Sequence, residues 1–218
     1  MQSTFSITEQ STLLSAWVHG WTISRGTPPA VALADDGFHI PVGLPGHLER
    51  YVLYGHAVSA IRSLARELSA ADTWLKICAP VTEVAALLPA CWQIRPAEYL
   101  MHKAIRASQA LNLPERYNMR IAEDGQAVTA HVLSTDGQIA ATGRMALSSH
   151  FAVFDQIVTD PAHRRKGLGQ QIMQALSNHA FGRQANTGVL VATEDGKALY
   201  TAIGWALVSA MTAAVICS

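Results

Sequence analysis

One continuous stretch, residues 151–182, constrains the fold more than any other part of this 218-residue chain. It begins with Phe151-Ala-Val-Phe-Asp-Gln-Ile-Val158, whose aromatic and β-branched residues are typical of a buried strand. Apolar residues then recur at helical spacing from Leu168 to Ala180, and Gly182 follows as a stop signal. Three consecutive cations and two glycines lie between these segments. The stretch therefore predicts a strand, a tight glycine turn and an amphipathic helix.

The turn between this strand and this helix has the composition of an anion site. Its cations are Arg164, Arg165 and Lys166, and its glycines are Gly167 and Gly169. The first turn of a helix has backbone N–H groups without partners and carries roughly half a positive charge. Glycine lets the backbone come close to a ligand oxygen, and each hydrogen bond to a charged group contributes about 1.5–3 kcal/mol. We therefore expect a phosphate or pyrophosphate here.

Two common phosphate loops are excluded by the residues at this turn. A P-loop requires G-x-x-x-x-G-K-[ST], which does not occur in the chain. A dinucleotide fingerprint requires G-x-G-x-x-G, but the position of the third glycine, after Gly167 and Gly169, is occupied by Ile172. A helix start with a solvated basic face is the structural alternative to a binding site.

The hexapeptide Arg164-Arg165-Lys166-Gly167-Leu168-Gly169 matches (Q/R)-x-x-G-x-(G/A), the motif of the GNAT superfamily of acyl-CoA-dependent N-acyltransferases. A second segment, Ala198-Leu-Tyr-Thr-Ala-Ile-Gly-Trp205, resembles that family's L-Y-x-x-x-G-(F/W) element. The two motifs occur in the family's order and are separated by one expected strand, Thr187–Thr193. The second half of the chain thus resembles a GNAT core.

This resemblance implies an α+β fold, in which helices flank a mixed, mostly antiparallel sheet. It also implies transfer of an acetyl group from acetyl-CoA to a primary amine, by direct attack of the amine on the thioester. The identity of the acceptor and the length of the acyl chain stay open. In the family, the strand before the loop contacts the pantetheine arm through its backbone, and the loop holds the phosphates. The residues implied to bind the coenzyme are Ile157, Val158, Thr159, Arg164, Arg165, Lys166, Gly167, Leu168 and Gly169.

Two residues are candidates for proton transfer. Tyr200 stands where the family commonly has a general acid toward the coenzyme sulfur, and an ordinary phenol, with a pKa of about 10, holds its proton at neutral pH. Asp155 lies on the strand where many members carry a carboxylate that accepts the amine proton. The structural alternatives are a packed tyrosine with one hydrogen bond and an aspartate that pairs with a neighbouring cation. His131 and His150 are weaker candidates, because a lone histidine more often has a structural role.

The first half of the chain departs from an ordinary GNAT protein. Only Glu123-Asp-Gly-Gln126 separates two expected strands between which the family places two helices. The chain instead resembles two-part GNAT proteins of the glycine N-acyltransferase-like and FR47-like kind. We therefore expect residues 1–108 to form a degenerate GNAT-like half without a phosphate loop, and residues 113–218 to form the catalytic domain. An unrelated α+β cap is the alternative for the first half.

Three segments of the first half carry local signals. Ala16–Ser24, with two tryptophans, is interpreted as a strand that follows a helical lead-in. Ala57–Ala70 has one apolar face and is predicted to be a helix, and Glu98–Ala107 is predicted to be helical as well. We expect these two helices to cover the side of the sheet that the missing helices leave bare, because an uncovered sheet is prone to aggregation.

Composition and charge exclude several function classes. The 16 lysines and arginines balance the 16 aspartates and glutamates, so nothing favours nucleic acid or another polyion as a partner. The nine histidines show no paired ligand spacing, so no metal is expected. The apolar run from Ile203 to Cys217 is shorter than the roughly 20 residues that span a bilayer, so no membrane segment is expected. Three widely spaced cysteines and the lack of a secretory signal favour a cytoplasmic location.

A non-catalytic coenzyme A-binding or regulatory module is the alternative to an enzyme. Such a module would keep the pocket for sensing and would not need a proton donor or acceptor, so Tyr200 and Asp155 favour the enzyme. The expected partners of the enzyme are acetyl-CoA and an amine acceptor, and the resemblance also allows a homodimer.

Overall fold

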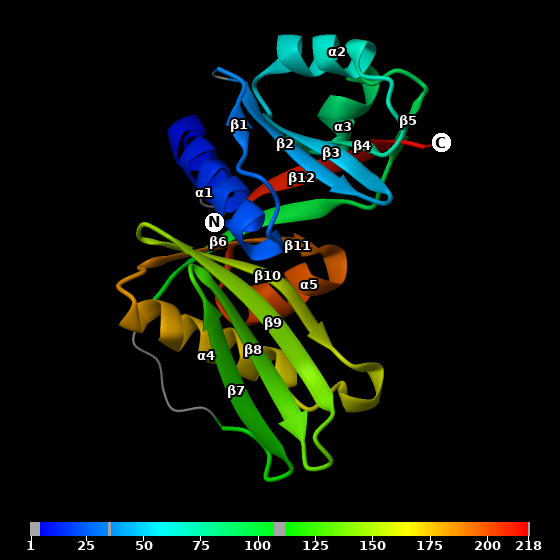
Figure 1. The fold of residues 1–218 in the computed structure, drawn as a ribbon. Coiled ribbons are helices and arrows are strands. Elements are labelled where there is room, and N and C mark those ends of the chain that lie inside the picture. Colours follow the sequence, from blue (N-terminus) through cyan, green and yellow to red (C-terminus); the bar gives the residue numbers. More distant parts are fainter. Residues whose placement is uncertain (1–4, 35, 107–111, 218) are drawn as a thin grey trace.

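The computed structural model describes residues 5–34, 36–106 and 112–217. Within these ranges, twelve strands form one sheet in the order β1-β2-β3-β4-β12-β6-β11-β10-β9-β8-β7, and β5 pairs with β12 outside this path (Figure 1). The strands are β1 (Val31–Ala32), β2 (Gly37–Leu44), β3 (His47–Tyr54), β4 (Thr73–Cys78), β5 (Trp92–Ile94), β6 (Glu98–Ala104), β7 (Tyr117–Asp124), β8 (Ala127–Ser134), β9 (Ile139–Ser148), β10 (Phe151–Thr159), β11 (Thr187–Thr193) and β12 (Ala206–Ile216). The helices are α1 (Ile7–Arg25), α2 (Val58–Glu67), α3 (Val81–Val84), α4 (Leu168–Gly182) and α5 (Glu194–Ala202), with short 3-10 turns η1 (Ala85–Leu87) and η2 (Pro161–His163).

The predicted fold class is confirmed. Helices flank a mixed sheet in which β3 and β4 run parallel, as do β10 and β11, while the other pairs are antiparallel. The strand, helix and second strand predicted between Phe151 and Thr193 are present as β10, α4 and β11, with ends that differ by at most two residues from the predicted ones. None of the described helices is long and apolar enough to cross a membrane.

The long strand β12 joins the upper and lower parts of the sheet (Figure 1). Its first residues, Ala206–Met211, pair with β6, and its last residues pair with β4 and β5. β6 in turn lies between β12 and β11, although it precedes them by about a hundred residues in the chain. The predicted division between residues 108 and 113 falls largely on residues outside the described ranges and stays a prediction.

The segment Ala16–Ser24 is not a strand, as the sequence suggested, but the second half of helix α1. The helix begins with a capping box, in which the side chains of Ser6 and Glu9 each accept a hydrogen bond from the other residue's backbone N–H. Trp17 and Trp21 are one turn apart and both buried, so their spacing fits a helix. The aromatic content of the segment led to the wrong prediction, because tertiary burial overrides such propensities.

The predicted helix Glu98–Ala107 is also wrong, because Glu98–Ala104 forms strand β6. Within β6, the adjacent residues Leu100 and Met101 are both completely buried, and they pack on opposite faces of the sheet. A strand that is covered on both faces loses the alternation of polar and apolar residues by which strands are recognised. Ala107 itself lies outside the described residues.

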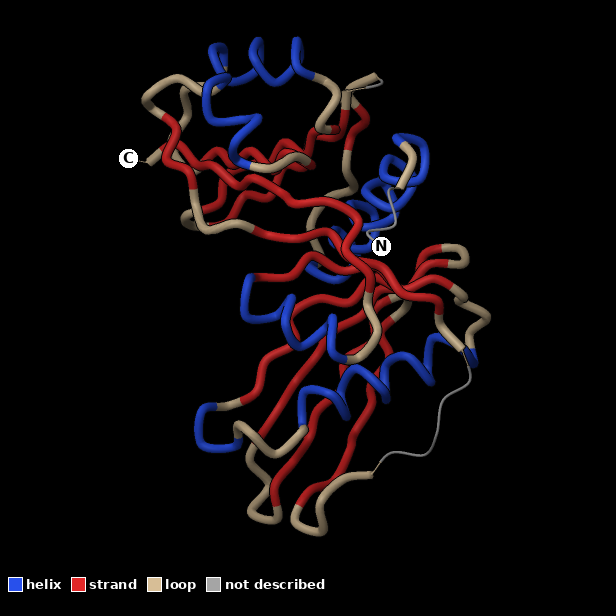
Figure 2. The backbone as a smooth tube through the Cα atoms, turned by 180° about the vertical axis from the view of Figure 1, so that it is seen from behind, coloured by secondary structure: helices blue, strands red, loops and turns tan. Residues whose placement is uncertain are grey.

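Helices cover both faces of the sheet where β9, β10 and β11 lie together. α4 packs on one face and α1 on the other, and Figure 2 shows α4 and α5 on the same side. Gly20 of α1 is seated directly on the sheet, since a Cβ at this position would lie 2.3 Å from a methyl carbon of Val153. α2 belongs to a separate core in the upper part, around Ile61. The prediction that α2 and the segment from Glu98 would cover the bare face of the sheet is therefore wrong, because α1 covers the face opposite α4.

Candidate functional site

The strands β10 and β11 separate halfway along their length and leave a slot between them. They pair only where Phe151–Phe154 lies beside Thr187–Leu190. A bulge follows in β10, where Gln156 has a φ of 53° and the register against β9 shifts. Beyond the bulge, β10 remains paired with β9 and β11 remains paired with β6, so the facing edges of β10 and β11 diverge.

A cavity of about 820 Å³ fills this slot. One wall is the end of β10, and the opposite wall is β11 from Leu190 to Thr193. Three predicted coenzyme residues, Ile157, Val158 and Thr159, line the cavity on the β10 side. The side chain of Ile157 packs against the hydrophobic core between the sheet and α4, so only its backbone is available to bind a ligand.

The predicted phosphate loop closes one end of the cavity. Asp160 caps the 3-10 turn η2 by accepting a hydrogen bond from the Ala162 amide at 2.8 Å. Gly167 is the N-cap of α4 and has a φ of 75°, a left-handed conformation that glycine adopts readily. The Gln171 amide donates the first backbone hydrogen bond of the helix, to the Gly167 carbonyl. The amides of the preceding turn therefore remain for a ligand. The loop thus has the geometry of an anion site at a helix start.

The cations of the loop take different positions. The exposed residues Arg164 and Arg165 line the cavity, together with Gly167, Leu168 and Gly169. The Lys166 ammonium instead donates a hydrogen bond to the Tyr117 hydroxyl at 3.0 Å. The Leu168 side chain is buried in the core, so that residue can offer a ligand only its backbone. Two of the three predicted cations therefore line the cavity, and the third does not.

Tyr200 lies on α5 and lines the cavity together with Asp155. Its side chain packs on Trp205, and Gly196, one turn earlier, leaves room for the ring, since a Cβ there would lie 3.2 Å from it. Burial and the negative charge of Asp155 raise the pKa of Tyr200 to about 12. The phenol therefore keeps its proton throughout the physiological pH range.

Asp155 is held from two sides by the end of α1. Arg25 donates from Nε to Oδ2 at 2.5 Å and from a terminal nitrogen to Oδ1 at 3.0 Å. The buried hydroxyl of Ser24 donates to Oδ2 at 3.3 Å. Neither partner could be predicted from the sequence, because both are about 130 residues away from Asp155 in the chain and carry no local motif. The bidentate pair ties α1 to the wall of the slot.

The GNAT acetyltransferase family model matches residues 84–205, more than half of the chain. This chain belongs to the GNAT family. It is therefore an acyltransferase, and members of the family use an acyl-CoA donor. The family match includes β10, the phosphate loop, α4, β11 and Tyr200.

Solved structures of other GNAT proteins share the fold over nearly the whole chain. A GCN5-related N-acetyltransferase from Kribbella flavida is 15% identical with a TM-score of 0.65, and the match covers 96% of each chain. An acetyltransferase of the GNAT family from Novosphingobium aromaticivorans is 16% identical with a TM-score of 0.59, covering 94% of this chain and 96% of its own. A GCN5-related N-acetyltransferase from Sphaerobacter thermophilus is 11% identical with a TM-score of 0.58, covering 98% and 94%. No curated protein sequence matches the chain.

The remaining sequence candidates of this GNAT protein lie away from the slot. His131 is on β8 and His150 is in the turn before β10, and neither lines the cavity. Within the described residues, no group of three or more histidines, cysteines or acidic residues is placed to hold a metal ion.

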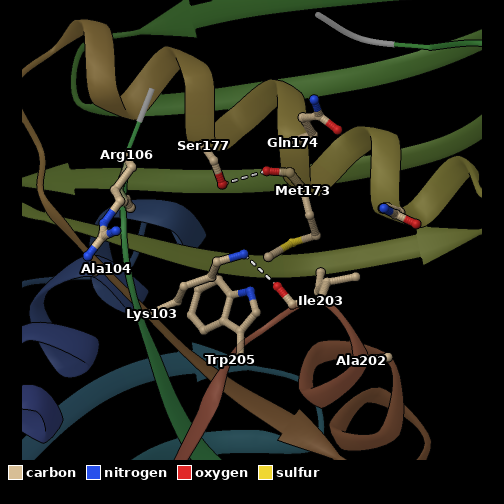
Figure 3. A pocket seen from close by; sticks show the side chains of 11 residues that line it. Lys103, Ala104, Arg106, Met173, Gln174, Ser177, Ala202, Ile203 and Trp205 are labelled. Carbon is tan, nitrogen blue, oxygen red and sulfur yellow. Dashed lines mark hydrogen bonds between the residues drawn. The ribbon is translucent and has the colours of Figure 1, made fainter. Parts of the chain in front are cut away.

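A second hollow, of about 600 Å³, lies between α4, the end of β6 and the end of α5 (Figure 3). Met173 and Trp205 line it, and the Lys103 ammonium donates to the Ile203 carbonyl at 2.5 Å (Figure 3). The cation of Lys103 is therefore already engaged by the protein. The hollow has no glycine-rich helix start of its own, so the slot between β10 and β11 is the stronger candidate for the active site.

Proposed function

We propose that this GNAT protein transfers an acetyl group from acetyl-CoA to a primary amine. The observation that supports this most is the order of groups along one slot. An anion-binding loop lies at one end, diverging strand edges form the walls, and a buried protonated phenol lies on α5. Acetyl-CoA carries a pyrophosphate, an amide-containing arm and a thioester in a matching order.

Coenzyme binding in this proposal relies mainly on backbone groups. The amides of Gly167, Leu168 and Gly169 and the guanidinium groups of Arg164 and Arg165 receive the pyrophosphate. The backbone of β10 from Ile157 to Thr159 forms hydrogen bonds with the amides of the pantetheine arm. The arm thus takes the place that β11 would occupy if the two strands did not diverge. Lys166 acts from a distance through its charge, since its ammonium is bound to Tyr117.

The proposed chemistry is a direct attack of the neutral amine on the thioester carbonyl. A C–N bond forms, and a backbone N–H of β10 stabilises the oxyanion, an interaction typically worth about 3–4 kcal/mol. When the C–S bond breaks, the thiolate takes the proton of Tyr200. The amine gives up one proton, which passes through water and restores the phenol. The products are the amide and free coenzyme A.

We propose a positioning role for Asp155 in place of the base suggested by the sequence. Both of its oxygens accept hydrogen bonds from Arg25, so protonation of the carboxylate would disrupt an ion pair. Its charge also favours the protonated form of Tyr200. Water then accepts the amine proton. We also propose a cytoplasmic location, because Cys78, Cys91 and Cys217 are all free thiols.

The test is thiol release from acetyl-CoA in the presence of a panel of primary amines. Turnover that depends on the amine, and that falls sharply in Tyr200→Phe, supports the proposal. Tyr99→Phe is a matched control, because the Tyr99 hydroxyl bonds to Glu194 and does not line the slot. Coenzyme A binding without turnover toward any amine would instead point to a non-catalytic module.

A further inference from the structure

Charged and aromatic side chains gather on the α1 face of the sheet, beside the slot. The indole of Trp21 in α1 lies close to two guanidinium groups, with the Arg50 Cζ 4.1 Å and the Arg25 Cζ 5.5 Å from its centre. The imidazole of His47 lies 6.0 Å from the Trp21 ring and 5.6 Å from the Trp74 ring. We call this set, together with Lys76, Glu98 and Asp155, the basic cluster.

The carboxylates of the basic cluster already hold cations of their own. Asp155 pairs with Arg25, and both oxygens of Glu98 accept hydrogen bonds from the Lys76 ammonium at 2.6 Å. Lys76 is 4% exposed, so its pair with Glu98 is largely withdrawn from water. Three cations therefore face two carboxylates, and one positive charge remains uncompensated.

The uncompensated cation is Arg50. Its side chain is buried, with 8% of the residue exposed, and burial lowers its pKa to about 10, so it is charged at neutral pH. Its Nε donates to Nε2 of His47 at 3.2 Å. Burial and the charge of Arg50 lower the pKa of His47 to about 3, so this acceptor is neutral. Among the described residues, no carboxylate forms an ion pair with Arg50.

An unpaired buried guanidinium is costly, and a bound anion removes that cost. The planar fork of arginine fits a carboxylate best, because it can donate two parallel hydrogen bonds. Asp155 belongs both to the basic cluster and to the lining of the slot. Arg50 lies close enough to Asp155 for the two charges to interact, so a carboxylate bound by Arg50 and an amine in the slot can belong to one small molecule.

We propose that the acceptor amine carries a carboxylate, as an amino acid does, and that Arg50 receives this carboxylate beside Trp21. Arg50 is then a specificity-determining residue for the acceptor. The inference rests on the proposed acetyl transfer to an amine, and it names the class of that amine.

The test compares each common L-amino acid with its own carboxamide as acceptor. The two members of a pair have the same size and differ in the charge of one group. Because the carboxamide has the less basic amine, more of it is neutral at pH 8, so basicity cannot explain a preference for the acid. We expect at least one amino acid to be used with a kcat/KM more than tenfold above that of its amide.

Two variants of Arg50 and one control variant test whether Arg50 causes the preference for the acid. Arg50→Met should remove the preference for the acid while the thermal shift caused by coenzyme A stays, and Arg50→Lys should keep part of the preference. Arg66→Met, on the exposed face of α2, is the matched control and should behave like wild type. If Arg50→Met does not fold, the comparison of acid and amide in the wild type and in Arg50→Lys decides the question.

Equal use of the acid and the amide by the wild type would overturn the proposal, and so would a preference that survives Arg50→Met. If no amine releases thiol, the proposed function fails, and binding then tests the carboxylate site separately. In that case, N-acetyl amino acids and their amides are added to the complex with coenzyme A. A thermal shift with the acids alone would support the site, and the lack of any difference would refute it.

Discussion

Substitution of Gly167 by valine is the most direct test of the coenzyme loop. Gly167 has a φ of 75°, and a residue with a Cβ pays about 1–2 kcal/mol of strain in this conformation. No atom lies within 4 Å of the position that a Cβ would take, so the effect within the protein is strain and not collision. Relief of the strain requires the peptide to rotate, which turns the amides of the first helical turn away from a ligand. The Cβ would also stand where phosphate oxygens approach.

The expected loss can be stated as a change in thermal stability. Coenzyme A at 100 times its dissociation constant stabilises the native state by about 2.7 kcal/mol, or about 5–10 °C for a chain of this size. Loss of two hydrogen bonds to a charged phosphate, at about 1.5–3 kcal/mol each, weakens binding by roughly two to four orders of magnitude. At the same coenzyme A concentration, the shift of Gly167→Val should therefore fall below about 1 °C.

Gly137→Val is a matched control for the strain. Gly137 lies in the hairpin turn between β8 and β9, has a φ of 82°, and also has no atom within 4 Å of its Cβ position. Both variants should unfold at a lower temperature than the wild type in the absence of ligand. Thermal unfolding monitored by circular dichroism, with and without coenzyme A, separates them, because only Gly137→Val should keep the full shift. A full shift in Gly167→Val would show that the loop does not bind the coenzyme.

Three further predictions follow from the site and the fold. Tyr200→Phe keeps the ring packing but removes the proton, so kcat should fall by roughly 10²–10⁴-fold with little change in the KM for acetyl-CoA. An unchanged kcat, with chemistry shown to be rate-limiting, would mean that Tyr200 has only a structural role. Since the pKa of Tyr200 is about 12, the phenol keeps its proton below that pH, and kcat should not decline as the pH rises to 10. A decline near pH 9 in the wild type that is absent from Tyr200→Phe would contradict this prediction. A chain that starts at Leu113 should be insoluble or inactive, because it lacks β6, which lies between β11 and β12, and α1, which covers one face of β9, β10 and β11. Solubility together with full activity toward the same acceptor would refute this dependence.

The coenzyme side of the slot could be predicted because its determinants are local in the sequence. A strand, a basic loop with two glycines, a helix, a second strand and Tyr200 follow one another between Phe151 and Tyr200. Each of these elements has a pattern that can be recognised without knowledge of its neighbours. The exact role of each cation was not predictable, since Lys166 turns to Tyr117 and this contact joins residues 49 positions apart.

The opposite side of the slot could not be predicted, because its determinants come together only through the fold. Arg25 and Asp155 are 130 residues apart, and neither the second half of α1 nor β6 was recognised from local pattern. In the sequence, Arg50 is one cation among sixteen that are balanced by sixteen anions, and nothing marks it as unpaired. It becomes an uncompensated charge only because β6 places Glu98 against Lys76 and α1 places Arg25 against Asp155. Overall neutrality of the chain therefore says nothing about the acceptor, and the local balance of buried charge on the α1 face is the property that favours a carboxylate.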